Sequence, residues 1–318
     1  MKLTEEQLNR YRREGYIIVP DIFPADQMDA ALGACDKITY GSSFDAWKAA
    51  GAKESVGDGI SSKAQHGRAQ FPSGERALDR LIENDDYLDI FEQLLGTSQL
   101  HYCNAHLFVR AGPNDKRHEP EAWQGYHIDH DTNTFLPPWI GPGHFDYVNS
   151  GVFLHDVEED GAPMQIIPGS HIPTARYLSQ WARDGIANAR GGIDDIRKIP
   201  GISEKRVSSK AKKGAAVFYS SYTLHAAIGF KNKSVQRAFW TMSIARADNQ
   251  SWTRYSVPYH YGEREFFIPF WKDASPRVRS LFGWPQPGHP YYTKETLELL
   301  LLSFPGMDLQ PYRERLGL

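Results

Sequence analysis

The chain has 318 residues, a formal net charge of −3 and an aromatic content of 13%. This charge gives no global basic field for nucleic acid or an anionic membrane, and the aromatic content argues against disorder. The start lacks a signal-peptide pattern, no apolar run is long enough to span a bilayer, and Cys35 and Cys103 are too few for a disulfide framework. We therefore expect a cytoplasmic globular protein that binds neither nucleic acid nor a membrane.

The first 97 residues are predicted to be mainly helical. The expected elements are helices over 4–13, 25–39 and 75–95 and a short strand over 16–20. Thr4 and Gln7 have the spacing of a capping box, and Gly15 and Gly96 supply the ends of the first and third helices. Residues 40–71 show no clear period and are expected to form a long functional or mobile connection.

From residue 98 to 247 the sequence changes to short aromatic and β-branched runs separated by Gly, Pro and Asn. The expected strands are 100–110, 125–131, 147–157, 164–167, 215–219, 224–230 and 235–245. Two insertions interrupt them, at 132–146 and 173–207, and the second contains a predicted helix over 175–183. After Asp248 we expect an irregular segment and a final helix over 293–303. The pattern predicts one mainly β body with flanking helices.

The stretch that contains His127 and Asp129 is the first candidate for chemistry. Residues two apart in a strand project from the same face, so this imidazole and this carboxylate lie side by side. Two such groups occupy only part of the coordination sphere of a divalent ion, and a third ligand must come from a distant segment. The alternative is a solvated polar turn, because His-x-Asp is a short pattern that recurs by chance.

His225, at the end of an apolar run, is the strongest candidate for the third ligand, and the alternative is a core histidine bonded to backbone. With a three-residue turn after Phe230, a hairpin places Ala227 opposite Arg237. Arg237 then lies on the same face as His225, about 7 Å away. A guanidinium there suits the far carboxylate of a small dicarboxylic acid whose other end chelates the metal, and the alternative is an exposed surface charge.

Two histidines and one carboxylate, here His127, Asp129 and His225, form the facial triad that holds non-haem Fe(II) and leaves three coordination positions free. A 2-oxo acid fills two of these positions through its carboxylate and keto oxygens, and O2 takes the third. These three residues are the predicted metal ligands and catalytic centre, and Arg237 is the predicted co-substrate clamp.

With these residues in place, the chain resembles the phytanoyl-CoA dioxygenase family of Fe(II)/2-oxoglutarate oxygenases over roughly residues 3–247. Four landmarks occur in the family's order: the opening at 3–23, the metal motif His127-Ile-Asp129, the hairpin and Pro-Gly-Ser-His run at 154–171, and the pair His225 and Arg237. In the family, this last pair corresponds to the distal histidine and the 2-oxoglutarate arginine. Four ordered landmarks are far more specific than any one of them.

The resemblance implies a double-stranded β-helix, a jelly-roll, cupin-like core, in a single oxygenase domain over 1–318. Residues 1–97 form helical support, 98–247 form the core, and 248–318 form a C-terminal extension in this interpretation. The implied cofactor is Fe(II), with 2-oxoglutarate and O2 as co-substrates. The expected reaction is hydroxylation of a C–H bond of a small organic molecule, with release of succinate and CO2.

The resemblance also raises questions at individual positions. Family members often carry Ser two residues after the distal histidine, where this chain has Ala227, so another donor substitutes or the clamp is weaker. By family alignment, His106 and Asn104 are expected to touch 2-oxoglutarate, and the alternative is ordinary polarity at the barrel mouth. Halogenating relatives have Gly or Ala in place of Asp129, so a carboxylate here favours hydroxylation or a related oxidation.

The insertion over 132–146 is a candidate substrate lid that carries Phe135 and Trp139, and the alternative is a surface loop with buried aromatic residues. His171 is expected to brace its own loop. The alternative functions are desaturation, epimerisation or ring formation by the same oxidant, and a non-catalytic cupin-like barrel, which has no need of Arg237. Substrate identity and oligomeric state have no motif in the sequence.

Overall fold

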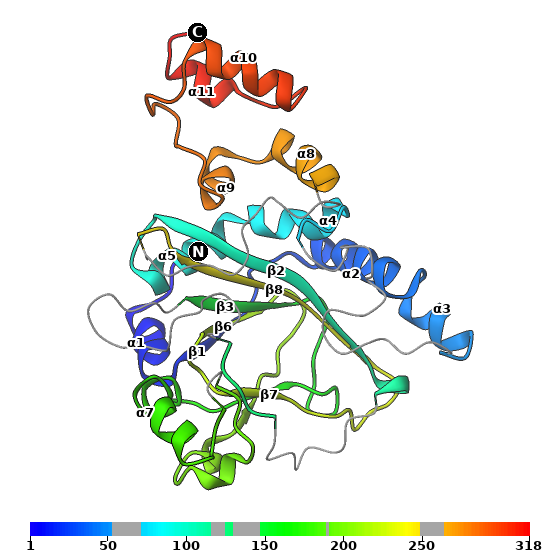
Figure 1. The fold of residues 1–318 in the computed structure, drawn as a ribbon. Helices are drawn as coiled ribbons and strands as arrows, with labels where there is room; N and C mark the ends of the chain where they lie inside the picture. The colour runs from blue at the N-terminus through cyan, green and yellow to red at the C-terminus, as the bar shows by residue number, and fades with distance from the viewer. Residues whose placement is uncertain (53–70, 116–124, 130–146, 189–190, 249–263) are drawn as a thin grey trace.

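A computed structural model describes residues 1–52, 71–115, 125–129, 147–188, 191–248 and 264–318. In these residues two antiparallel sheets face each other (Figure 1), with the strand orders β1-β6-β3-β8-β2 and β5-β4-β7. The strands are β1 (Tyr16–Val19), β2 (Leu100–Ala111), β3 (Val148–Phe153), β4 (Met164–Ile166), β5 (Val207–Ser208), β6 (Ala216–Ser220), β7 (His225–Ala227) and β8 (Gln236–Arg246). This is the jelly-roll arrangement that the sequence led us to expect.

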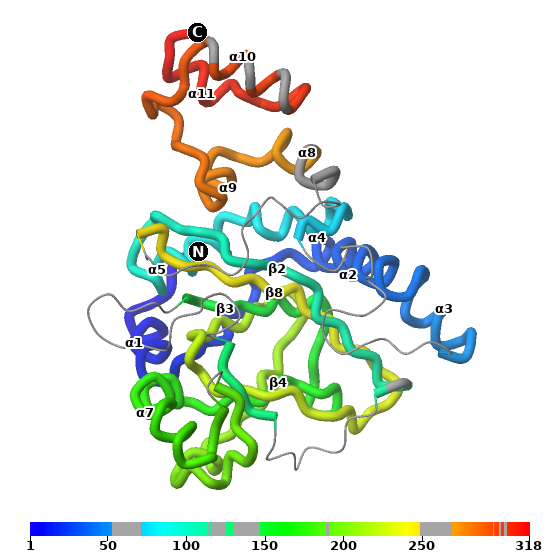
Figure 2. The backbone as a smooth tube through the Cα atoms, viewed as in Figure 1, coloured from blue at the N-terminus to red at the C-terminus, as the bar shows by residue number. Residues whose placement is uncertain are grey.

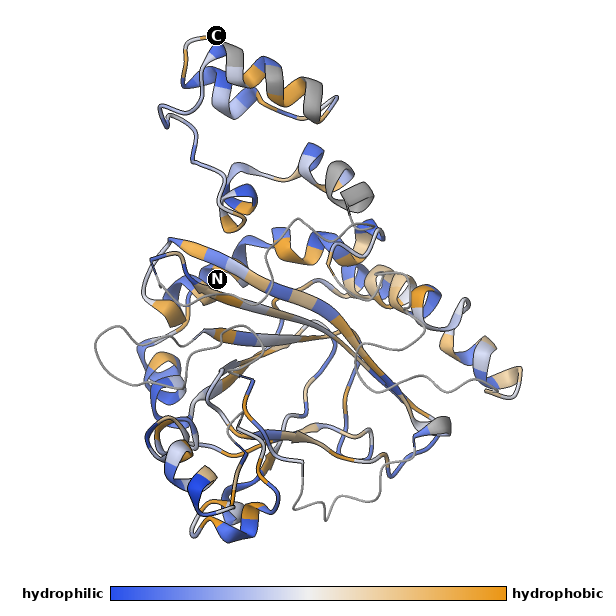
Figure 3. Cartoon of the chain, viewed as in Figure 1, coloured by the Kyte–Doolittle hydropathy of each residue, from blue (hydrophilic) through white to orange (hydrophobic). Residues whose placement is uncertain are grey.

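The larger sheet has two differently covered faces. Apolar and polar residues alternate along β2 (Figure 3), as expected for a strand whose successive side chains point to opposite faces. One face meets the smaller sheet in a cluster made of Tyr16, Phe153, Val157, Met164, Ile166, Ala215, Val217, Tyr219 and Phe239. The other face is covered by α2 (Ala25–Tyr40), α4 (Arg76–Asp79) and α5 (Asp85–Leu95) (Figure 1). The inner face is therefore where functional side chains of both sheets can meet.

The N-terminal helices follow the sequence closely, with one exception. Helix α1 (Glu5–Glu14) has the predicted capping box at Thr4 and ends at Gly15, whose φ is 74°. The single helix predicted over 75–95 is wrong, because η1 (Arg80–Glu83) and a break at Asn84 separate α4 from α5. Asn84 has extended backbone, and its side chain accepts from the N–H of Tyr87 at 2.9 Å. Asparagine stabilises a helix start more than a helix interior, which explains the break.

Other boundaries differ from the sequence prediction in detail. Helix α3 (Phe44–Ala49) lies in the stretch expected to be without secondary structure, and α7 (His171–Arg183) begins four residues before the predicted helix. The expected strand over 125–131 is represented by bridges at Tyr126 and His127, and β7 covers only three residues of the expected 224–230. The two-residue strand β5 was not predicted.

The predicted hairpin between β7 and β8 is wrong. β7 pairs with β4, whereas β8 pairs with β2 and β3. The carbonyl of Ile228 accepts from Arg110 at 2.6 Å, and the N–H of Phe230 donates to the Asp115 carboxylate at 3.2 Å, so these groups are not available to a hairpin ladder. The chain instead passes from the smaller to the larger sheet between β7 and β8, and Arg237 lies in the opposite sheet from His225.

The C-terminal segment is helical where the sequence predicted mostly irregular structure. It contains α8 (Arg264–Asp273), α9 (Pro276–Leu281), α10 (Lys294–Ser303) and α11 (Gln310–Glu314), and its trace extends away from the sheets (Figure 2). Arg277 joins this segment to α5 through Asp85, Asp89 and Glu92, at 2.6, 2.6 and 2.8 Å. Among the described helices, none combines the length and the apolar character needed to cross a membrane.

Candidate metal centre

His127 and His225 are brought together by backbone pairing. The N–H of each residue donates to the carbonyl of the other at 3.0 Å, which makes them opposite members of an antiparallel bridge. The N–H of Asp129 donates to the carbonyl of Ser221 at 3.1 Å and fixes the backbone two residues after His127. Two distant segments therefore place the predicted ligands at one point, as the sequence predicted.

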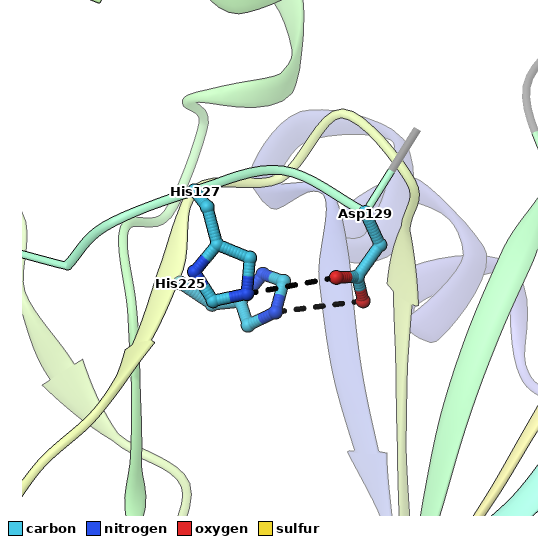
Figure 4. Close-up of side chains that lie close together, drawn as sticks. All are labelled: His127, Asp129 and His225. Carbon is cyan, nitrogen blue, oxygen red and sulfur yellow. Dashed lines mark ion pairs between the residues drawn. The ribbon is translucent and has the colours of Figure 1, made fainter. Parts of the chain in front are cut away.

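The side chains of these residues converge (Figure 4). The Nε2 atom of His127 lies 3.6 Å from Oδ1 of Asp129, and Nε2 of His225 lies 3.5 Å from Oδ2. One ligand atom from each of the three residues lies within 4.8 Å of the others. Two imidazole nitrogens and one carboxylate are a donor set that suits a divalent first-row metal ion.

Backbone carbonyl groups orient both imidazoles for metal binding. Nδ1 of His127 is 2.9 Å from the carbonyl oxygen of Gly125, and Nδ1 of His225 is 3.0 Å from that of Thr223. Because a carbonyl oxygen only accepts, Nδ1 carries the proton in each ring and Nε2 is the nitrogen that can bind a metal. His225 is thus bonded to backbone through Nδ1 and directed at Asp129 through Nε2. The backbone bond expected of a core histidine is therefore compatible with a role as metal ligand.

The three candidate ligands perturb one another electrostatically. Burial raises the pKa of Asp129, but the charges of His225 and His127 outweigh burial and hold this pKa well below its usual range. Burial lowers the pKa of His225, but the neighbouring Asp129 carboxylate outweighs burial and raises this pKa above its ordinary value. In the metal-free site His225 therefore retains a proton to a higher pH than an ordinary histidine.

This arrangement predicts that metal affinity decreases as the pH is lowered. A protonated His225 paired with Asp129 stabilises the metal-free fold at low pH, and this contribution is lost as pH rises through the raised pKa of His225. Metal binding requires the neutral imidazole, so we expect Co(II) affinity to fall roughly tenfold per pH unit once His225 is protonated. Titrations of apo-protein with Co(II) between pH 8 and pH 6 measure this, and an affinity independent of pH would contradict it.

Arg237 is buried, at 1% exposed, and opposite Arg110 in the β2–β8 register. Its Nη1 donates to the carbonyl of Ala162 at 2.7 Å, and its guanidinium carbon lies 5.3 Å from the ring centroid of Phe108 and 5.1 Å from that of Phe239. Phe239 belongs to the cluster between the two sheets, so Arg237 lies on the inner face. This burial excludes the alternative of an exposed surface charge.

The other predicted site residues have different outcomes. His106 and Asn104 share the inner face of β2 with Phe108 and pair with Thr241 and Ser243 of β8. Burial lowers the pKa of His106 to about 4, against the opposing charge of Asp129, so this imidazole is neutral near pH 7. The predicted lid, with Phe135 and Trp139, lies outside the described residues. Nε2 of His171 lies 3.1 Å from the carbonyl oxygen of Arg12, so this side chain connects the start of α7 to α1, and its predicted role in its own loop stays a prediction.

Three residues around Asp129 were not singled out in the sequence. Asn149 and Tyr219 each donate to Oδ2 of Asp129 at 3.0 Å, and the hydroxyl of Tyr147 donates to its backbone carbonyl. Asn149 interrupts an otherwise apolar or small run in β3, and this is the only local signal of its role.

Near Arg237, His155 was also missed. Its Nε2 accepts from the N–H of Ala238 at 3.0 Å, while its Nδ1 lies 2.7 Å from the carbonyl oxygen of Asp156. This side chain therefore takes the place of a backbone acceptor at the start of β8, immediately beside Arg237. A histidine in a loop has no sequence pattern that indicates such a contact.

A double-stranded β-helix with two histidines and one carboxylate on facing segments defines the class of Fe(II)- and 2-oxoglutarate-dependent oxygenases, which use Fe(II), 2-oxoglutarate and O2. The model of the phytanoyl-CoA dioxygenase family matches residues 11–238, and the chain belongs to this family. The matched residues include all three candidate metal ligands and Arg237. No match occurs among curated protein sequences.

Solved structures with the same fold include three that were determined with ligands. The epimerase SnoN, in complex with Fe3+, alpha ketoglutarate and nogalamycin RO, has 20% identity and a TM-score of 0.52, covering 76% of this chain and 83% of SnoN. EctD from S. alaskensis with 2-oxoglutarate and 5-hydroxyectoine has 18% identity and a TM-score of 0.52, covering 78% of each chain. HygX from Streptomyces hygroscopicus with nickel and 2-oxoglutarate has 12% identity and a TM-score of 0.51, covering 78% of this chain and 88% of HygX. At these identities the similarity shows the fold.

Proposed function

We propose that His127, Asp129 and His225 bind the catalytic Fe(II), that Arg237 binds the far carboxylate of 2-oxoglutarate, and that the enzyme hydroxylates a C–H bond of a small organic molecule. Bound Fe(II) supplies the oxidising chemistry, with 2-oxoglutarate converted to succinate and CO2 as O2 is consumed. The convergence of two oriented Nε2 atoms and one carboxylate is the observation that carries this proposal.

We infer that a dicarboxylate binds along the inner face of the larger sheet, between the metal ligands and Arg237. Asn149 of β3 contacts Asp129, whereas His155, beyond the end of this strand, contacts the start of β8 beside Arg237. Between them β3 carries Gly151, where an added Cβ would meet Val217 and Phe239 at 3.4 and 3.9 Å. Side chains of the protein fill the space beside this glycine, and the buried guanidinium of Arg237 supplies the charge for a carboxylate.

The substrate and the outcome of the oxidation are further parts of the proposal. Two solved neighbours hold organic molecules with 2-oxoglutarate, nogalamycin RO in SnoN and 5-hydroxyectoine in EctD, which supports a small-molecule substrate. The Asp129 carboxylate occupies the position that is Gly or Ala in halogenating relatives, which supports hydroxylation. A barrel that only binds metal has no use for the buried charge of Arg237, which argues against a non-catalytic role.

An anaerobic titration of apo-protein with Fe(II) and then 2-oxoglutarate tests the proposal. We expect a visible metal-to-ligand charge-transfer band after the second addition, because a bidentate 2-oxo acid on Fe(II) produces one. The band should be absent from Asp129→Ala and His225→Ala. Iron binding without the band in the wild-type protein would contradict the assignment of 2-oxoglutarate as co-substrate.

A further inference from the structure

The two oxygens of the Asp129 carboxylate have different surroundings. Oδ2 accepts a hydrogen bond from the amide nitrogen of Asn149 and another from the hydroxyl of Tyr219, each at 3.0 Å. Oδ2 also lies 3.5 Å from Nε2 of His225, whereas Oδ1 lies 3.6 Å from Nε2 of His127. Hydrogen bonds to an ionised carboxylate are the stronger ones in proteins, so two of them fix the rotation of this side chain. Oδ2 is thereby held by two protein donors, and Oδ1 is the oxygen on the side of His127.

The donors to Oδ2 come from adjacent strands in one cross-strand row. Asn149 of β3 lies opposite Tyr219 of β6 on one side and opposite Ser243 of β8 on the other. Residues opposite each other in a sheet point to the same face, so all three side chains face the interior. The ring centroid of Tyr219 also lies 4.9 Å from that of His225, so this row contacts two of the three candidate ligands.

Ser243 determines which end of the Asn149 amide faces Asp129. The Ser243 hydroxyl donates to Oδ1 of Asn149, and this leaves the NH2 group of Asn149 to donate to Asp129. A reversed amide would direct its oxygen at the carboxylate, and two acceptors would then face each other. The three side chains are buried, at 4% exposed for Asn149, 7% for Tyr219 and 6% for Ser243, so water does not readily replace a lost partner.

We propose that Asn149 and Tyr219 are positioning residues that hold Asp129 as a monodentate ligand through Oδ1, and that Ser243 fixes the Asn149 amide for this purpose. The inference rests on the proposed metal site and extends it. A carboxylate with both oxygens available can occupy two coordination positions of a metal ion. By retaining Oδ2, these residues keep three positions open, which is the number that 2-oxoglutarate and O2 require.

The test uses Co(II) binding to apo-protein, because it needs neither substrate nor turnover. We expect Tyr219→Phe and Asn149→Ala each to weaken Co(II) binding roughly 10- to 100-fold, as is typical when a partner of a metal ligand is removed. The visible Co(II) spectrum should also change, because the released carboxylate alters the coordination number. Ser243→Ala should show a smaller change of the same kind, and Ser243→Thr, which retains the hydroxyl, should restore wild-type binding.

Tyr87→Phe is the matched control. Tyr87 is a fully buried tyrosine of α5 whose hydroxyl contacts Ser150, the neighbour of Asn149 in β3, on the opposite face of the sheet. It should lower stability without a change in Co(II) affinity or spectrum. Wild-type Co(II) affinity and spectrum in Tyr219→Phe and Asn149→Ala would overturn the inference, as would equal weakening in Tyr87→Phe. If the three proposed ligands do not bind metal at all, the wild type and Asp129→Ala will have the same Co(II) affinity. This outcome is therefore distinguishable from a failure of the positioning role.

Discussion

Replacing His127, Asp129 or His225 with alanine is expected to reduce Fe(II)-dependent succinate formation below detection. Each residue supplies one of the three converging donor atoms, and the loss of one leaves two protein ligands and a disordered coordination sphere. Asp129→Ala should have the largest effect on metal affinity, because it also removes the negative charge that attracts the cation. Succinate release and Co(II) titration of each variant provide the two measurements.

The control for these variants is His289→Ala. His289 is exposed and lies in the C-terminal segment, so its removal tests whether the loss of any histidine lowers activity. His127 and His225 also pair through their backbones, and an alanine substitution leaves these backbone donors and acceptors in place. Melting curves of the metal-free proteins separate a lost ligand from a lost fold. Full succinate formation by any one of the three ligand variants would remove that residue from the metal site.

The common direction of His127 and Asp129 was predictable because its signal is local. The i, i+2 spacing of His127 and Asp129 determines their common direction in extended backbone, and the capping box at Thr4 likewise needs only neighbouring residues. The residues that hold Asp129 had no such signal. Asn149 and Tyr219 lie on different strands, and only the pairing of β3 with β6 brings them together beside the carboxylate.

The Arg237 side chain points to the interior, although the strand pairing from which we predicted its direction is wrong. The predicted hairpin placed Arg237 and His225 in one sheet, whereas they belong to opposite sheets that enclose a common interior. Alternation along β8 is enough to direct Arg237 to the same face as Phe239, whatever the partner strand. Which strands pair with β7 and β8 depends on long-range contacts, above all the hydrogen bonds that Arg110 and Asp115 make with the backbone of 228–230.

Arg237→Ala is expected to raise the 2-oxoglutarate concentration needed for half-maximal succinate formation by about 10- to 100-fold, the equivalent of about 1.5–3 kcal/mol for a hydrogen bond to a charged group. Co(II) affinity should change much less, because the described contacts of Arg237 are with Ala162, Phe108 and Phe239 and not with the metal ligands. Arg237→Lys should have an intermediate requirement, since it retains the charge but loses the planar pair of donors.

Arg246→Ala is the matched control, because Arg246 lies at the other end of β8, where it pairs with Asp248 at 2.8 Å on the surface. Its requirement for 2-oxoglutarate should equal that of the wild type. Arg237 is also packed between two aromatic rings, so Arg237→Ala will lower the melting temperature whether or not it binds the co-substrate. The 2-oxoglutarate requirement therefore has to be read at a temperature where both proteins are folded. An unchanged requirement in folded Arg237→Ala would place the carboxylate clamp elsewhere, and Arg110, the buried neighbour of Arg237 across the strands, would be the next residue to test.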